Sequence, residues 1–388
     1  MHRWLSRFAV ASSLFLGGSS WAAPSPTCDE GDVTQLSAGF RHACAVRADH
    51  SLWCWGFNFN GQLGTGSTTY EYTPVQVTAL GHRVRSVAAS DQHTCAITVD
   101  NSLWCWGDNS SGELGDGTTT NSLVPVAVPG LTHAVASVAV GANTTCVVKG
   151  DHSLVCWGAS YNGSLGAGGT GNILTPSPIV GLESQKTVEV SLLTDLCALT
   201  EQGAVYCWGD NQYGDLGQGD LVTRYTPTPV TALPAPIRTV TAHGDAVCAL
   251  DVAGNVSCWG KNDSGQVGDG SNVPAYPFAV PSPTVLATIP DSVDVAVGNG
   301  AGCAIQRGGR LSCWGSNFQG ELGVGDTTDR DTPTPVALPG VTSVSIGEGF
   351  ACATDDRRNV YCWGDDSLGQ LGVSGISGSL VPNRVPMP

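Results

Sequence analysis

This sequence predicts an all-β fold, a seven-bladed β-propeller of four-stranded antiparallel blades, on three observations. A Cys-Trp-Gly triplet occurs seven times in 388 residues, at intervals of 49 to 55 residues. Another cysteine precedes each triplet by ten residues. Short segments rich in β-branched residues alternate with Gly- and Pro-rich turns in every repeat. A fixed period of this length indicates one continuous repeat array rather than separate domains.

The innermost strand of each repeat is predicted from short segments of β-branched and small residues, such as Thr34–Gly39 (TQLSAG) and Val293–Gly298 (VDVAVG). One position in this segment is always Ser, Ala or Thr. Sheets that radiate from a common axis bring their innermost strands close together, so only small side chains fit there. The seven small residues are Ser37, Ala88, Ala139, Ser191, Thr241, Ala296 and Ser345.

The second and third strands of each repeat are predicted to form a hairpin with one cysteine on each strand. In the first repeat they are His42–Arg47 (HACAVR) and Ser51–Gly56 (SLWCWG). Equal spacing on both sides of the turn places the two sulfur atoms on one face at opposed positions, within reach of a disulfide. The nine intervening residues do not match the short spacing of zinc ligands. The seven predicted disulfides are Cys44–Cys54, Cys95–Cys105, Cys146–Cys156, Cys197–Cys207, Cys248–Cys258, Cys303–Cys313 and Cys352–Cys362.

A Gly-rich loop follows each hairpin, as in GDNSSGELG from Gly107, and its single Leu or Val is expected to anchor the loop on the core. Each repeat then ends in a Pro-bearing segment, from Thr73–Leu80 in the first repeat to Val381–Pro388 in the last. Pro lacks the N–H that a central strand needs, so these segments are predicted edge strands. The propeller is assigned to residues 34–388, with repeats at about 34–82, 83–133, 134–184, 185–236, 237–291, 292–339 and 340–388.

A linear solenoid is the alternative architecture for such an array. A solenoid needs capping repeats at both ends, and the terminal repeats here resemble the internal ones. The sequence leaves open how the ring closes. All four strands of a blade could come from one repeat, or the two terminal segments could share a blade.

An export signal peptide is predicted at residues 1–22. Two arginines supply a positive region, an uncharged apolar stretch follows, and small residues place the cleavage near Ala22-Ala23. A buried helix at an unprocessed start is the alternative. Residues 23–33 then form a short N-terminal tail ahead of the first strand.

The cysteine pairs and the signal peptide together predict a periplasmic or extracellular protein, since disulfides persist in oxidising compartments. Cys28 is the fifteenth cysteine and has no partner in the repeats. We expect it to be a free thiol in a monomer, with an intermolecular bond to a partner or a second copy as the alternative. No stretch after residue 22 is long and apolar enough for a membrane helix, so no membrane insertion is expected.

The charge and the motifs exclude several classes of function. The formal net charge of −16 disfavours nucleic acid and anionic lipid as partners. The sequence lacks the nucleophile elbow, the phosphate-binding loop and the paired-histidine zinc motif, so we expect no enzyme, no cofactor and no catalytic residues. Small channel residues, without an acid–base pair, also disfavour catalysis or carbohydrate binding in the channel.

Two groups of residues resemble metal ligands, but their repeat positions favour structural roles. His42 and His93 share a position that other repeats fill with Thr, Asp, Ala or Phe, so a turn-stabilising hydrogen bond is expected. Asp108–Glu113 resembles a calcium loop, yet the equivalent segments contain Phe57 or Lys261. No metal site is therefore predicted. The tryptophans of the Cys-Trp-Gly triplets are expected to pack between blades rather than to form a light-sensing cluster.

The segment His93–Gly115, HTCAITVDNSLWCWGDNSSGELG, resembles the repeat of the regulator-of-chromosome-condensation family, whose units combine a hairpin, a Trp-Gly pair and a Gly-Gln-Leu-Gly loop. The resemblance covers about residues 34–388 and implies a seven-bladed propeller. Family members include an exchange factor for a small nuclear GTPase and the plant ultraviolet-B receptor. In compartment the chain is more similar to a secreted bacterial propeller that inhibits β-lactamase, so it looks like an exported, bacterial-type member.

Aromatic side chains on one rim are the candidate partner-binding residues. The connections between strands one and two and between strands three and four should share a face, because the strands alternate direction. Exposed aromatic groups among polar residues are typical of protein-binding patches, and rings folded onto the blades are the alternative. The candidates are Phe40, Phe57, Phe59, Tyr161, Tyr213, Phe318 and Phe350.

We therefore expect a non-enzymatic, exported repeat scaffold that binds a macromolecular partner, most simply a protein, through loops on this face. Inhibition of an exported hydrolase such as a β-lactamase is the first alternative. A regulator similar to a guanine-nucleotide exchange factor is the second, and only the family resemblance implies it.

Overall fold

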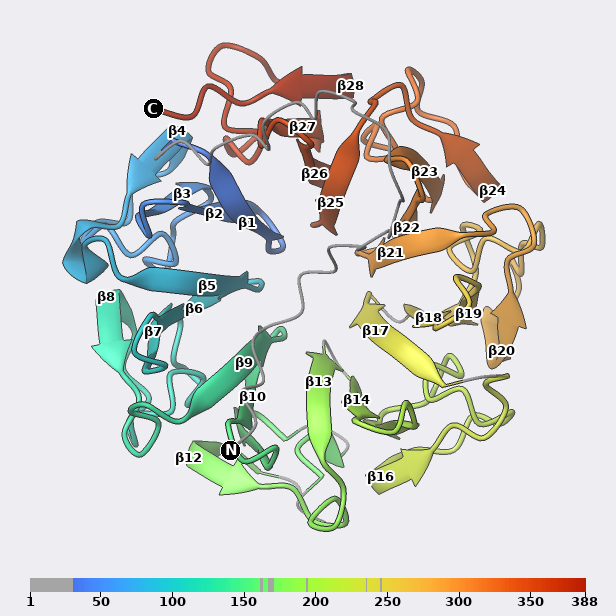
Figure 1. Ribbon diagram of the computed structural model, residues 1–388, viewed down its shortest axis with the longest axis horizontal. Helices are drawn as coiled ribbons and strands as arrows, with labels where there is room; N and C mark the ends of the chain where they lie inside the picture. Colours follow the sequence, from blue (N-terminus) through green and yellow to red (C-terminus); the bar gives the residue numbers. More distant parts are fainter. Residues whose placement is uncertain (1–30, 161–162, 167–170, 193–194, 235, 245) are drawn as a thin grey trace, which may run out of the picture.

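The computed structural model describes residues 31–160, 163–166, 171–192, 195–234, 236–244 and 246–388. Seven four-stranded sheets stand around a central axis (Figure 1), and each sheet uses four strands that are consecutive in the sequence. Neighbouring strands within each sheet are antiparallel. The predicted all-β, seven-bladed propeller is confirmed. Blades 1 and 7 meet without sharing a strand, which answers how the ring closes.

The first strand of each blade lies nearest the axis (Figure 1). These strands surround a central cavity of about 370 Å³. The position that is always Ser, Ala or Thr lines this cavity in all seven blades, which confirms the predicted crowding at the axis. The first strands are β1 (Val33–Ala38), β5 (Val84–Ala89), β9 (Val135–Val140), β13 (Thr187–Leu192), β17 (Ile237–His243), β21 (Ser292–Val297) and β25 (Val341–Ile346).

The second and third strands form the predicted hairpins. The second strands are β2 (His42–Arg47), β6 (His93–Thr98), β10 (Thr144–Lys149), β14 (Asp195–Thr200), β18 (Ala246–Asp251), β22 (Ala301–Gln306) and β26 (Phe350–Asp355). The third strands are β3 (Leu52–Gly56), β7 (Leu103–Gly107), β11 (Leu154–Gly158), β15 (Val205–Gly209), β19 (Val256–Lys261), β23 (Arg310–Gly315) and β27 (Val360–Asp365).

All seven cysteine pairs are disulfide-bonded in the structure. Within each pair the two cysteines are direct cross-strand neighbours, as in Cys95 opposite Cys105, and the Cα–Cα distances are 4.1 to 4.2 Å. All fourteen sulfur-bearing side chains are buried. The pairing predicted from the ten-residue spacing is thus confirmed. Cys28 lies outside the described residues.

The outer strand of each blade carries proline and pairs on one side only, as predicted for an edge. These strands begin two or three residues earlier than the first and last predicted segments. The outer strands are β4 (Glu71–Gln76), β8 (Ser122–Ala127), β12 (Ile173–Pro178), β16 (Arg224–Pro229), β20 (Ala279–Val285), β24 (Arg330–Pro335) and β28 (Gly378–Arg384). A 3₁₀ turn, η1 (Thr78–Leu80), follows β4.

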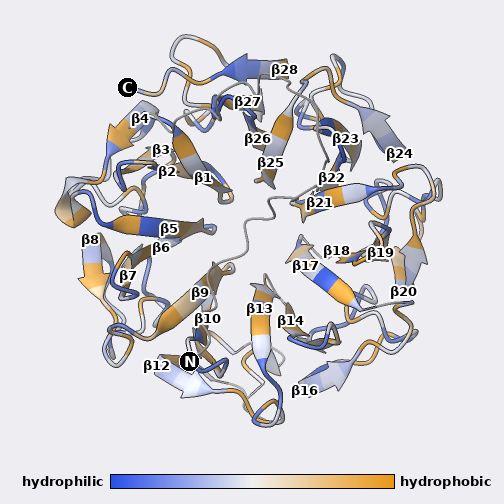
Figure 2. Ribbon diagram, viewed as in Figure 1, coloured by the Kyte–Doolittle hydropathy of each residue, from blue (hydrophilic) through white to orange (hydrophobic). Residues whose placement is uncertain are grey.

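The hydrophobic core consists of seven clusters, each shared by two adjacent blades. Between blades 1 and 2, for example, Val46 and Leu52 pack with Val87, Ala96 and Trp106. Apolar residues are accordingly spread over all seven blades rather than gathered on one side (Figure 2). A blade buries both faces only when its two neighbours are present, so the ring is stabilised as a whole.

Each junction between blades also contains one hydrogen bond from a buried tryptophan. The indole Nε1 of every Cys-Trp-Gly triplet donates to a main-chain carbonyl in the Gly-rich loop of the preceding blade, at 2.8 to 3.0 Å. The pairs are Trp55–Gln370, Trp106–Gln62, Trp157–Glu113, Trp208–Ser164, Trp259–Asp215, Trp314–Gln266 and Trp363–Glu321. The prediction that these tryptophans pack between blades is confirmed.

The last glycine of each Gly-rich loop lies against the same indole. Gly64 has φ +71°, and a Cβ built on it would lie 2.7 Å from Nε1 of Trp106. Across the seven junctions the corresponding distances are 2.5 to 2.9 Å. Both the left-handed backbone and the close approach of the indole therefore require glycine here.

Most of the Gly-rich loops are each held by the side-chain amide of one buried asparagine. In five repeats an asparagine accepts a hydrogen bond from the anchoring Leu or Val N–H and donates to the loop through Nδ2. In blade 1, Asn58 Nδ2 donates to Ser67 O and Thr69 O at 3.0 and 2.9 Å, and Oδ1 accepts from Leu63 N at 2.9 Å. The other four are Asn109, Asn211, Asn262 and Asn317.

Blade 7 has Asp366 in this position. Its Oδ1 accepts from Leu371 N at 2.8 Å, but the buried Oδ2 has no hydrogen-bond partner among the described residues. Burial raises the pKa of Asp366 to about 6, and the neighbouring Asp365 carboxylate also raises it. A carboxylate cannot supply the two donations that asparagine makes elsewhere.

Loss of one disulfide should lower stability without abolishing the fold. The double change Cys95→Ala and Cys105→Ala opens a ten-residue loop, which should cost about 3 kcal/mol at most. Guanidinium unfolding measures the change. Alkylation of the denatured but unreduced wild type should leave the fourteen paired cysteines unmodified, and labelling of these thiols would contradict the disulfide assignment.

Two glycines that differ only in their surroundings separate backbone strain from contact with the indole. Gly64→Ala should destabilise the protein by about 1–3 kcal/mol more than Gly66→Ala. Gly66 has a similar φ of +81°, but its nearest neighbour, Val124 Cγ1, is 3.8 Å from the added Cβ. Chemical denaturation of both variants measures the difference. Equal destabilisation would show that the packing against Trp106 is not limiting.

Asp366→Asn should raise the melting temperature at pH 8, and the gain should shrink towards pH 4. The folded-state pKa of about 6 lies above 3.8, the ordinary pKa of an aspartate, so wild-type stability falls as pH rises between these values. The amide removes that penalty and can donate to the loop. Asp331→Asn, at an exposed carboxyl on β24, is the control and should change little. A gain that is independent of pH would contradict this account.

Candidate functional site

The loops between strands one and two and between strands three and four lie together on one face of the ring. In blade 1, Phe57 N in the second loop donates to Arg41 O in the first, at 2.9 Å. In blade 2, Asp108 N donates to Gln92 O at 2.9 Å. The predicted sharing of one face is confirmed, and the face holds the candidate site.

Three aromatic rings cluster on the second loop of blade 1. Asn58 is buried and holds the loop, whereas its neighbour Phe57 is half-buried and Phe59 is exposed. Their ring centroids are 6.4 Å apart with the planes 13° from parallel, and Tyr70 lies 5.0 Å from Phe57. Phe59 is 65% exposed. Together with Phe40 on the first loop, these residues are called the blade-1 aromatic cluster.

A small notch opens beside this cluster, between blades 1 and 2. It has a volume of about 230 Å³ and is lined by Phe40, Arg41, Phe57, Asp91 and Gln92. The Arg41 guanidinium lies 5.4 Å from the centroid of Phe40. The notch therefore combines two aromatic walls with charged and amide groups from the adjacent blade.

The charges around the notch are unbalanced towards negative. Arg41 Nε is paired with Glu348 Oε2 of blade 7 at 2.6 Å. Asp91 Oδ1 is buried and has no hydrogen-bond partner among the described residues. Burial raises the pKa of Asp91 to about 6, Glu348 raises it further and Arg41 opposes both. At pH 7.5 two carboxylates thus face one guanidinium.

The remaining candidate aromatics are not part of this cluster. Phe318 is 80% exposed on blade 6, at the repeat position of Phe59. Tyr213 on blade 4 is half-buried, with the Lys261 ammonium 5.4 Å from its ring centroid. Tyr161 lies outside the described residues. The structure therefore brings together three of the predicted residues and places two others on separate blades.

The placement of Phe350 on the rim was wrong. Its side chain is fully buried in the core between blades 7 and 1, with Trp55 and Cys352. The first residue of β26 takes the same inward position as His42 in β2, which is also fully buried. The repeat alignment contained this signal, because Phe350 and His42 are equivalent.

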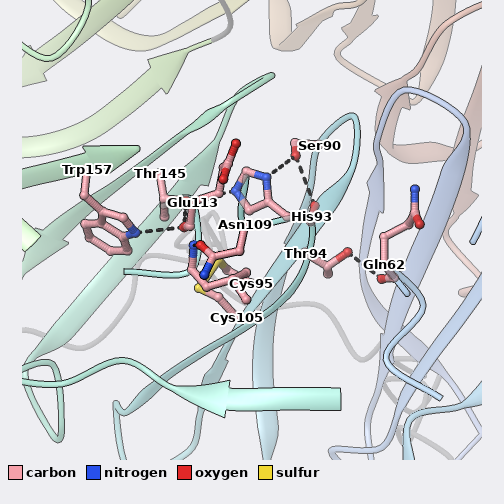
Figure 3. The surroundings of a disulfide bond; sticks show 11 residues. Gln62, Ser90, His93, Thr94, Cys95, Cys105, Asn109, Glu113, Thr145 and Trp157 are labelled. Atoms are coloured by element: carbon pink, nitrogen blue, oxygen red, sulfur yellow. Dashed lines mark hydrogen bonds between the residues drawn. A yellow bond between two sulfur atoms is a disulfide. The ribbon is translucent and has the colours of Figure 1, made fainter. Parts of the chain in front are cut away.

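Both histidines form a hydrogen bond to the next blade, and His93 also forms one within its own turn. His93 Nε2 lies 2.9 Å from Thr145 Oγ1 of blade 3, whose hydroxyl donates to Glu113 O at 2.8 Å. Because that hydroxyl proton is used, the histidine must be the donor. Figure 3 shows the His93 ring between Ser90 and Thr145. The predicted turn hydrogen bond therefore exists at His93, where Nδ1 lies 3.0 Å from Ser90 Oγ, whereas His42 Nδ1 has no hydrogen-bond partner among the described residues.

Both imidazoles are suited to this structural role and not to proton transfer. His42 Nε2 lies 2.8 Å from Thr94 Oγ1, in the same arrangement one blade earlier. Burial lowers the pKa of His42 and of His93 to about 3. Within the described residues, no group of three or more His, Cys, Asp or Glu side chains is placed to hold a metal ion.

The side chains of the segment Asp108–Glu113, which resembled a calcium loop, form hydrogen bonds within their own loop. Asn109 is one of the loop-holding amides, and Leu114 N donates to its Oδ1 at 2.9 Å. Glu113 is buried and its Oε2 accepts from Ser111 N at 2.8 Å, while burial raises the pKa of the carboxyl. The structural role expected for this segment, that of stabilising its turn, is the one that these hydrogen bonds perform.

The channel carries two carboxyl groups that the sequence did not indicate. Glu189 on β13 and Asp294 on β21 both line the central cavity, with Thr239 on the blade between them. Thr239 Oγ1 donates to Glu189 Oε1 at 2.8 Å. Burial raises the pKa of Glu189 to about 7 and that of Asp294 to about 6. The sequence analysis did not find these two carboxyls, because they lie on blades 4 and 6 and are far apart in the sequence.

One further exposed aromatic pair was not predicted. Tyr276 is 75% exposed and meets Phe278 edge to face, with centroids 6.0 Å apart. It belongs to the extended connection of the fifth repeat, whose greater length was the available signal. Within the described part of the chain, no helix has the length and apolar character needed to cross a membrane.

Comparison with known proteins places this architecture in a family. Two models of the regulator of chromosome condensation (RCC1) repeat match the chain, one at residues 49–97, 100–148, 202–250, 253–305 and 308–354, the other at 33–62, 84–113 and 341–370.

Curated relatives and solved structures agree with this match. The ultraviolet-B receptor UVR8 of Arabidopsis thaliana is 31% identical over 328 residues, covering 81% of this chain and 73% of the receptor. The human E3 ubiquitin-protein ligase HERC2 is 32% identical over 207 residues, 52% of this chain and 4% of that protein. The crystal structure of Prp20p from Saccharomyces cerevisiae superposes with a TM-score of 0.76 at 20% identity, covering 92% of this chain and 88% of Prp20p. The chain belongs to the family of proteins built from regulator of chromosome condensation (RCC1) repeats.

Proposed function

We propose that this protein is a non-enzymatic scaffold that binds a protein partner through the blade-1 aromatic cluster. The observation that carries the proposal is the pair of stacked rings, Phe57 and the 65% exposed Phe59, beside an open notch. Large exposed aromatic groups beside a concave pocket are typical anchors of protein interfaces. The described notch residues include no nucleophile beside a base, which supports binding rather than catalysis.

The chemistry of the notch favours a basic partner surface. Arg41 is already paired with Glu348, and Lys261 on the same face is paired with Asp263 at 3.3 Å. Beside the notch, Asp91 Oδ1 has no hydrogen-bond partner among the described residues, and the pKa of about 6 leaves the Asp91 carboxyl charged at neutral pH. An apolar or aromatic side chain in the notch, flanked by lysine or arginine, would complement both the rings and the charge.

We further propose that the protein works outside the reducing cytosol, in the periplasm or extracellular space. Seven buried disulfides favour an oxidising compartment. The charged, apolar and small-residue order of residues 1–22 supports export by a cleaved signal peptide.

Removal of the two rings should abolish partner capture without changing stability. Immobilised wild-type protein and a Phe57→Ala, Phe59→Ser double variant are compared for capture from periplasmic extract or culture fluid of the source, with bound proteins identified by mass spectrometry. The control, Val252→Ser, changes a side chain that is also 65% exposed but lies in the turn between β18 and β19 on the opposite face. Equal capture by all three proteins would contradict the proposed surface.

A further inference from the structure

A second cavity lies on the face opposite the blade-1 aromatic cluster, where the two ends of the ring meet. Its volume is about 460 Å³. It is lined by the β26–β27 turn of blade 7, by the segment after β28, and by Gly31 and Asp32 ahead of β1. We call this cavity the closure pocket.

The closure pocket is cationic in a protein of net charge −16. Three guanidinium groups line it, those of Arg357, Arg358 and Arg384. Arg358 Nε pairs with Asp32 Oδ2 at 3.7 Å, whereas Arg384 Nη2 donates to the neutral Asn359 Oδ1 at 2.6 Å. The Arg357 guanidinium has neither an ion pair nor a hydrogen bond to any described residue. Two positive charges are therefore unneutralised.

Two further carboxyl groups of the turn do not line the pocket. Asp355 is buried and accepts from the N–H groups of Arg357 and Asn359, and from Asn359 Nδ2 at 2.9 Å. Its oxygens are therefore held by hydrogen bonds within the turn. Asp356 lies against Gly340 and does not line the pocket.

Equivalent pockets in other blades lack this charge. Blade 3 has a cavity of about 440 Å³ whose charged lining residues are Asp151, Glu183 and Lys186, with one histidine. Blade 6 has one of about 520 Å³ in which Arg310 is the charged residue. A pocket at this position thus occurs in three blades, but among these three pockets the cationic lining is found in blade 7.

The residue type at Arg358 departs from the repeat, whereas the backbone does not. The equivalent position is left-handed in all seven blades, and Arg358 has φ +61°. Three blades place glycine there, and the others place His50, Asn101 and His152, residue types that tolerate this region better. A disfavoured residue at such a position points to a role for its side chain.

We propose that the closure pocket binds a phosphate monoester group. Two unpaired guanidiniums match the charge of a dianionic phosphate, and their planar N–H forks suit its oxygens. The rest of the lining is largely apolar, with Val360, Val385, Pro386 and Met387. The volume exceeds what one oxyanion fills, since a water molecule occupies only about 30 Å³. The apolar wall accommodates the organic part of the ester.

Isothermal titration calorimetry of the full chain at pH 8 and constant ionic strength tests the site. The probes are phenyl phosphate, inorganic phosphate and acetate. Phenyl phosphate should bind one to one and more tightly than inorganic phosphate, because the ring adds apolar contact, and acetate should be weakest. If inorganic phosphate binds most tightly, the ligand is the free ion and not a phosphate ester. If no probe gives a heat of binding, the closure pocket is not a binding site.

Arg357→Gln is the decisive variant, because this side chain has no ion pair or hydrogen bond to lose among the described residues. It should weaken phenyl phosphate binding about tenfold or more at unchanged melting temperature. Arg310→Gln in the blade 6 pocket is the matched control and should bind as wild type does. Equal affinity of Arg357→Gln and wild type would overturn the proposal. A second outcome would also overturn it. If phenyl phosphate binds only after Asp29→Asn and Glu30→Gln, the acidic residues just before Gly31, then the chain's own N-terminal tail occupies the pocket.

Discussion

A hydrogen bond from a buried indole to the loop of the preceding blade recurs at all seven junctions, and the ring depends on it. The indole also presses on the last glycine of that loop, where no Cβ fits. One contact therefore determines the tryptophan, the glycine and the backbone of the loop. Because the junction of blades 7 and 1 uses the same contact, Trp55 to Gln370, the ring closes without a shared strand.

The two kinds of crosslink act at different levels. Disulfides join the second and third strands within a blade, whereas the tryptophans join one blade to the next. At two junctions a histidine adds a second link, as when His93 reaches Thr145 and that hydroxyl bonds to the carbonyl that also accepts from Trp157. The main-chain oxygen of Glu113 thus uses both lone pairs on the neighbouring blade. Because these hydrogen bonds use the capacity of the buried polar groups at this junction, they fix the positions of those groups.

The proposed functions rest on positions that these constraints leave free. Phe59 follows the loop-holding Asn58, and Arg358 occupies the one left-handed position of its turn. The residue type at each of these two repeat positions varies between blades, although blade 6 also has a phenylalanine, Phe318, at the position of Phe59. Since the core needs nothing specific there, individual blades can acquire different surfaces on the same frame. The blade-1 aromatic cluster and the closure pocket lie on opposite faces, so two ligands could bind without competing.

From the sequence alone came the features that repeat: seven blades, four strands in each, seven disulfides, small residues at the axis and tryptophans between blades. They were predictable because each depends on spacing within about 50 residues. Phe350 could also have been placed correctly from its equivalence to His42. Only the tertiary structure showed the carboxyls of Glu189 and Asp294 in one channel, the notch beside Phe57 and the arginines gathered at the closure. These groups come from different blades or from opposite ends of the chain, and ring closure, not sequence proximity, makes them neighbours.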